Sequence, residues 1–132
     1  MNSIRTIITD RTLLLAGAIY FTSVALCHAI GWKFPGFFVF YDIPSTPYQD
    51  RIISFLAFGW AVFFFTAASD PMKNRALIRA ILIAGAVAII ALAMIISSNE
   101  ITRAVASTTM YWVQTGMLGV YWISLFTGYR RS

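Results

Sequence analysis

"KFPGFFVFYDIPSTPYQDR", residues 33–51, separates two long apolar runs and contains three of the four prolines in the chain. Lipid offers no water to the backbone groups that a proline or glycine leaves unpaired, so this stretch does not cross a membrane. Its second half carries Thr46, Pro47 and Gln49 at the spacing of an N-cap, a first helical position and a capping-box partner. Asp50 adds a carboxylate to the first turn, where the helix dipole stabilises it. The stretch therefore predicts a loop followed by a helix that begins near Pro47.

The charged residues are few, and they are segregated along the chain. Of its 132 residues, 59% are hydrophobic and 11% are charged, whereas a soluble domain carries about a quarter charged residues. Roughly 20 apolar helical residues cross a bilayer core of about 30 Å. Four runs of about this length contain no Asp, Glu, Lys or Arg: residues 12–32, 52–69, 80–99 and 104–129. They leave no room for a separate soluble domain, so we expect no nucleic-acid partner.

These runs predict one all-α domain over residues 1–132, an integral membrane four-helix bundle of up-down-up-down topology. The short connections after the second and third runs favour tight antiparallel hairpins. The expected spans cover about residues 10–32, 47–69, 71–96 and 98–128, with an outer loop over residues 33–46.

The expected spans have recognisable starts. Asp70 with Pro71 repeats the start signal for the third span, and Ser97 with Glu100 does so for the fourth. Arg5 precedes the first run as in a signal peptide, but the run is too long and lacks a small-residue cleavage site. We therefore expect the first run to be a retained span.

The basic residues predict the orientation, because short cytoplasmic loops carry the excess of Lys and Arg. The side of the N-terminus would hold seven of them: Arg5, Arg11, Lys73, Arg75, Arg79, Arg130 and Arg131. The opposite side would hold three: Lys33, Arg51 and Arg103. We therefore expect a multi-pass protein of the cell inner (cytoplasmic) membrane with both termini in the cytoplasm.

Polar residues near the middle of the spans are the candidate ligand-binding residues: Tyr20, Ser23, Gln114 and Tyr121. Their helical spacing places them on inward faces, and Tyr111 shares the face of Gln114. Such residues can line a cavity for a quinone, a sterol or a lipid head, or they can bond to one another and to the neighbouring backbone. The amide of Gln114 is the most informative, because it must find a partner away from water.

Other reactive chemistry is sparse. His28, the only histidine, is a weak candidate for a metal or pigment ligand together with Asp42, Asp50 or Glu100, and otherwise an interfacial polar residue. Cys27 is the only cysteine, which excludes an intrachain disulfide and a CxxC redox pair. The spans carry no charged residue near the midplane, which disfavours ion-coupled transport. No catalytic residue is predicted, which favours a protein that is not an enzyme and leaves an enzyme without recognisable motifs as the alternative.

The outer loop carries the aromatic residues Phe37, Phe38, Phe40 and Tyr41. They are expected either to lie in the outer headgroup zone as an anchor or to fold over the bundle. In the second case they form a lid over a ligand or a docking surface for another subunit.

Cytoplasmic termini, an acidic and aromatic outer loop that ends in "QDR", and an alanine-rich third span together resemble small uncharacterised bacterial membrane proteins with four spans. The first functional hypothesis is a non-catalytic accessory or structural subunit that packs against a larger membrane complex or against itself. The small-residue stripe Ala80, Ala84, Ala88 and Ala91 favours this, because it permits close helix contact. The alternative is a binder of an apolar small molecule such as a quinone or a lipid, or a poorly marked enzyme acting on it, with the molecule held between the helices beneath the outer loop.

Overall fold

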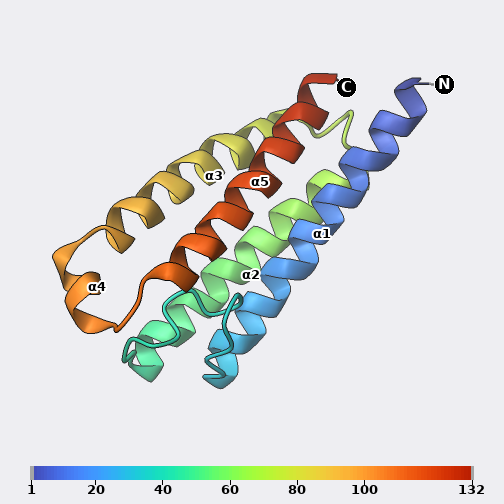
Figure 1. The fold of residues 1–132 in the computed structure, drawn as a ribbon. Coiled ribbons are helices and arrows are strands. Elements are labelled where there is room, and N and C mark those ends of the chain that lie inside the picture. Colours follow the sequence, from blue (N-terminus) through green and yellow to red (C-terminus); the bar gives the residue numbers. More distant parts are fainter. Residues whose placement is uncertain (1, 132) are drawn as a thin grey trace.

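The computed structural model describes residues 2–131, with side chains placed from Asp10 to Arg131. All regular secondary structure in this part of the chain is helical. The side chain of Arg5, which contributed to the expected orientation, lies outside the described residues. The helices are α1 (Asn2–Ile30), α2 (Pro47–Ser69), α3 (Arg75–Ile96), α4 (Asn99–Ala104) and α5 (Thr109–Arg131) (Figure 1).

Within the described residues, three helical stretches are long and apolar enough to cross a membrane: Asp10–Ile30, Pro47–Ser69 and Arg75–Ile96. The expected all-helical membrane class is confirmed at this level. The fourth expected span is not among these stretches, because α5 intersperses Gly, Thr, Gln and Tyr with its apolar residues.

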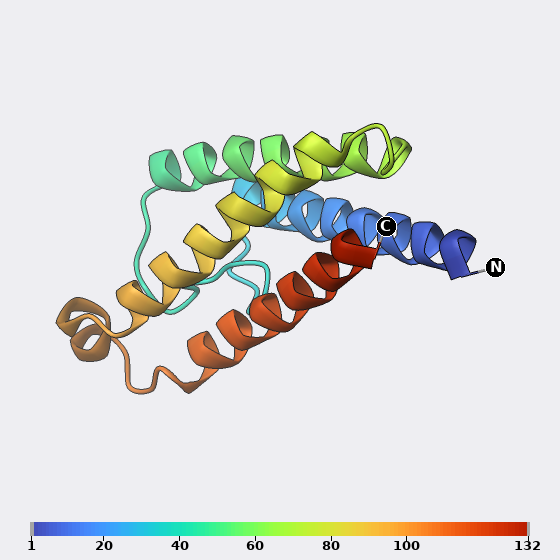
Figure 2. The ribbon, with the colours of Figure 1, turned by 90° about the horizontal axis from the view of Figure 1, so that it is seen from above.

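The four long helices alternate in direction, and both ends of the chain lie at the same end of the molecule (Figure 1). Helices α1 and α2 lie side by side over much of their length, and α3 and α5 form a second pair (Figures 1 and 2). We call the end that holds the chain termini the closed end. The opposite end, with α4 and the loop between α1 and α2, is the loop end.

Two local signals delimit the loop between α1 and α2, and the second of them was expected. Helix α1 ends at Ile30, and the next residue, Gly31, has a φ of 71°. The N–H of Trp32 donates to the carbonyl of Cys27 at 2.8 Å, which is a Schellman arrangement. Helix α2 begins at Pro47 with a complete capping box between Thr46 and Gln49. The predicted start of the second span is therefore confirmed.

The expected start of the third span is wrong by four residues, and the helix expected from residue 98 begins one residue later. The turn after Asp70 does not continue into α3, because the Asp70 carboxylate accepts from the N–H of Lys73 at 3.2 Å and so closes a separate turn; α3 begins at Arg75. Ser97 ends α3 instead of capping the next helix, and Ser98 is the N-cap of α4.

The predicted continuous helix over residues 98–128 is also wrong, because the chain leaves the helix after Ala104 and resumes it at Thr109. In the interruption the Ser107 hydroxyl accepts from the N–H of Thr109 at 3.3 Å and donates to the Thr109 hydroxyl at 3.0 Å. Serine and threonine offer the backbone such local partners and so compete with helix continuation. The fourth long helix is therefore only α5.

The apolar core differs between the two ends. At the closed end, buried side chains from all four long helices form one cluster: Leu14, Ala18, Phe64, Ala67, Ala68, Ile78, Ile81, Leu82 and Leu125. Towards the loop end, the second cluster consists of Val24, Ala25 and Ala57, all from α1 and α2. Figure 2 shows the α3–α5 pair diverging from the α1–α2 pair in this direction, with the loop running into the gap between the ribbons.

Candidate functional site

The loop between α1 and α2 folds over the loop end of the bundle. Phe38 is buried, and its ring stacks on the imidazole of His28 with the ring centroids 3.7 Å apart. The hydroxyl of Tyr20 donates to the carbonyl of Gly36 at 2.8 Å, and Gly36 has a φ of 93°, which a residue with a Cβ rarely adopts. The aromatic segment therefore packs on the protein through Phe38.

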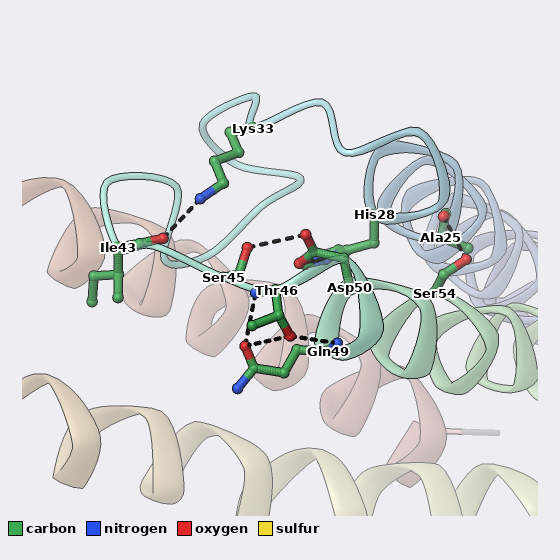
Figure 3. A network of polar contacts seen from close by, with 9 residues as sticks. All are labelled: Ala25, His28, Lys33, Ile43, Ser45, Thr46, Gln49, Asp50 and Ser54. Atoms are coloured by element: carbon green, nitrogen blue, oxygen red, sulfur yellow. Dashed lines mark hydrogen bonds and ion pairs between the residues drawn. The ribbon is translucent and has the colours of Figure 1, made fainter.

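His28 and Asp50 form a buried pair beneath this loop. His28 lies in the last turn of α1 and Asp50 in the first turn of α2, and 3.5 Å separates His28 Nδ1 from Asp50 Oδ1 (Figure 3). The other carboxylate oxygen accepts from the Ser45 hydroxyl at 3.0 Å. A buried carboxylate must be paired and hydrogen-bonded, so this contact ties α1, α2 and the loop together.

The surroundings of His28 bear on its expected metal role. Of the three carboxylates considered as its partners, Asp50 is the one found beside it. In the part of the chain with described side chains, no group of three His, Cys, Asp or Glu residues could hold a metal ion. His28 and Asp50 therefore form a two-residue contact between α1 and α2.

Three of the four predicted ligand-binding residues bond to the backbone. Besides Tyr20, the Tyr121 hydroxyl donates to the carbonyl of Leu13 at 2.7 Å, and the Ser23 hydroxyl donates to the carbonyl of Ile19 at 3.0 Å. Tyr20 faces the loop, whereas Tyr121 packs against Phe64 of the closed-end core. The four residues do not converge on one point, and these three hydroxyls already use their protons.

Gln114 is different. Both polar atoms of its side chain are buried, and they have no hydrogen-bond partner within the described residues. The same holds for the hydroxyls of Tyr111 and Thr115, whose residues are 1% and 5% exposed. These positions, spaced three and four apart, share one face of α5, and we call Tyr111, Gln114 and Thr115 the α5 polar cluster. Sequence analysis missed Thr115, whose only signal is its four-residue spacing from Tyr111.

The loop aromatics reach this cluster. Phe40 and Tyr41 meet the Tyr111 ring edge-on, with centroids 5.3 and 5.7 Å away. The Tyr111 hydroxyl lies near the backbone amide of Asp42, but it makes no hydrogen bond of good geometry there. The loop thus contacts the His28–Asp50 pair through Phe38 and the α5 polar cluster through Phe40 and Tyr41.

The chemistry that these groups offer is hydrogen bonding without charge. A buried donor or acceptor that lacks a partner costs about 1–3 kcal/mol, and native proteins contain few of them. The cluster places four such atoms, two from Gln114 and one hydroxyl each from Tyr111 and Thr115, within two turns of α5.

Comparison of the chain with protein families, with curated proteins and with solved structures finds no significant match. The resemblance in layout to small bacterial four-span proteins stays a prediction.

Proposed function

We propose that this chain is a small integral membrane protein that binds an apolar small molecule between its helices beneath the outer loop. The observation that carries the proposal is the α5 polar cluster, whose four buried polar atoms have no hydrogen-bond partner in the described part of the chain. A bound molecule with a polar end would supply those partners, and its apolar remainder would lie between helices or in lipid.

The proposal includes a four-span bundle, with α5 as the fourth span. Its 23 residues extend about 35 Å at 1.5 Å per residue, enough for a hydrocarbon core of about 30 Å. Its buried polar residues Tyr111 and Thr115 face the protein, while Met117, Val120 and Ile123 are exposed. A helix whose polar side chains face inward can lie in lipid despite modest average hydropathy.

We place both termini in the cytoplasm of a cell with an inner membrane. Support comes from the described basic residues at the closed end, among them Arg75, Arg79 and Arg130, because short cytoplasmic loops carry the excess of Lys and Arg. A reporter fused to the C-terminus should be cytoplasmic, and one inserted near Ser45 should be exported. Export of the C-terminal reporter would contradict this orientation.

The test of ligand binding is native mass spectrometry of the protein purified in a mild detergent. We expect a retained small molecule in the unaltered chain and its loss in the Gln114→Leu variant. Ser124→Ala is the matched control, because the Ser124 hydroxyl lies on the same helix but donates to its own helix at Val120, 2.9 Å away. Equal retention in both variants, or no retained molecule in any of them, would contradict the proposal.

A second candidate function is that of an accessory subunit, and the outward face of α3 favours it. Ala80, Ala88 and Ala91 of the small-residue stripe are exposed, and Ala84 is partly buried, because Ile78, Ile81 and Leu82 face the core instead. Small residues on an outer face allow another helix to approach closely. Ala88→Leu should then release a co-purifying subunit, whereas the same change at exposed Val87 should not.

A further inference from the structure

We infer that the polar end of the bound molecule is a neutral planar ring carrying oxygen atoms, of the quinone class, and not a phospholipid headgroup. This inference rests on the proposed function and adds the chemistry of the ligand. It follows from the charge, the hydrogen-bonding capacity and the ring surfaces around the α5 polar cluster.

Charge excludes an ionic headgroup. The segment from residue 104 to residue 129 contains no Asp, Glu, Lys or Arg, and the side chains of the cluster are uncharged. The carboxylate of Asp42 is the charged group that acts on Tyr111, and it would repel a phosphate. Lys33, a cation of the loop, donates instead to the carbonyl of Ile43 at 2.9 Å. Burying an anion without a cationic partner is strongly unfavourable.

The hydrogen-bonding capacity of the cluster fits ring carbonyls, which accept hydrogen bonds, and ring hydroxyls, which also donate them. The amide of Gln114 donates through its nitrogen and accepts through its oxygen, and the hydroxyls of Tyr111 and Thr115 can do either. A ring carbonyl can accept from the amide or from a hydroxyl, and a ring hydroxyl can donate to the amide oxygen. The cluster can therefore donate to the ring carbonyls of a quinone, and it can also accept from the ring hydroxyls of a quinol.

The ring surfaces favour a flat head. Phe40 and Tyr41 both meet Tyr111 at interplanar angles near perpendicular, 66° and 64°. Three aromatic rings thus gather beside the polar atoms, and aromatic rings prefer edge-on or offset contacts with another flat ring. Since Phe40 and Tyr41 belong to the loop, the loop would contribute directly to holding the ring.

The experiment uses the full chain in phosphatidylcholine nanodiscs, titrated with a short-chain ubiquinone while tryptophan fluorescence is recorded. Trp112 lies next to the cluster on α5 and serves as a reporter. We expect saturable quenching, with binding about tenfold weaker in Thr115→Val, which keeps the shape of the side chain and removes one hydroxyl. Gln114→Leu should weaken binding further, and Ser124→Ala should leave it unchanged.

The outcomes separate this inference from the proposed function. If native mass spectrometry finds a phospholipid that depends on Gln114 while ubiquinone does not bind, the ligand class is wrong and the proposed function stands. If neither molecule binds, both are wrong. Saturable ubiquinone binding that Thr115→Val and Gln114→Leu leave unchanged would also overturn the inference, because the ring would then lie elsewhere. Circular dichroism of each variant confirms that it is folded, and Thr115→Val alone decides the matter if Gln114→Leu does not fold.

Discussion

At the closed end, side chains from four helices share one apolar core, and the polar groups among them bond to the backbone: Tyr121 to Leu13, and Trp122 to Leu82 at 2.7 Å. At the loop end, the buried apolar cluster belongs to α1 and α2 alone. There the polar side chains of α5 are buried without partners in the described residues. The difference teaches that polar residues at the closed end are satisfied by the fold itself, whereas those of α5 at the loop end have no hydrogen-bond partner among the described residues.

The largest expected effect tests whether the closed end is the main source of stability. Phe64→Ala should lower the free energy of unfolding by about 3 kcal/mol, because Phe64 is 3% exposed and its removal leaves a cavity between helices. Its neighbour Phe63 is 50% exposed, so Phe63→Ala is the matched control and should change little. The measurement is denaturant unfolding in detergent, and equal losses for both variants would contradict a core at this end.

The second expected effect concerns the His28–Asp50 pair. Asp50→Ala should loosen the loop by about 2 kcal/mol, because it leaves the buried His28 imidazole and the half-buried Ser45 hydroxyl without the carboxylate. Hydrogen exchange should therefore accelerate in the loop while the closed end stays protected. Asp42→Ala, at an exposed position of the same loop, is the control. Unchanged exchange in the Asp50 variant would show that the aromatic contacts alone hold the loop.

The third prediction compares the stability effect of one polar side chain at each end. In protein stripped of small molecules, Gln114→Leu should raise the free energy of unfolding by about 1 kcal/mol, because it removes two unpaired buried atoms. Tyr121→Phe should lower it by about 1 kcal/mol, because it removes the hydrogen bond to the Leu13 carbonyl. Thermal unfolding of both variants provides the measurement. Loss of stability in both would mean that Gln114 also has a structural role.

The smallest expected effect lies in the turn between α2 and α3. The backbone N–H of Lys73 lowers the pKa of Asp70 below its ordinary value of 3.8. A carboxyl whose folded pKa is depressed contributes stability above its unfolded pKa and loses it as the pH falls through the folded pKa. Asp70→Asn should therefore remove a small decline in stability below about pH 4. A decline of the same size in this variant would assign it to other carboxyl groups.

The sequence allowed prediction of the start of α2, where the deciding contacts are local and their pattern has one reading. The capping box at Thr46 and Gln49 lies within four residues, and it placed the start of α2 correctly. Residues 33–46 were correctly predicted as a loop, since prolines and a glycine prevent a helix there. The interruption at residues 105–108 was missed because Ala, Val, Ser and Thr are all tolerated in helices, and because a hydroxyl cap is one of several options open to Ser107.

By itself, the sequence determined the helical class, the apolar stretches and the presence of a non-spanning aromatic loop, because charge segregation and helix signals act over a few residues. Only the tertiary structure decided which polar side chains have a hydrogen-bond partner. Tyr20 finds the carbonyl of Gly36, 16 residues away, and Tyr121 finds that of Leu13, 108 residues away. Gln114 lies at the end where the helix pairs diverge and finds none among the described residues. Hydrogen-bond partners depend on how helices are placed in space, and the spacing along one helix carries no information about its neighbours.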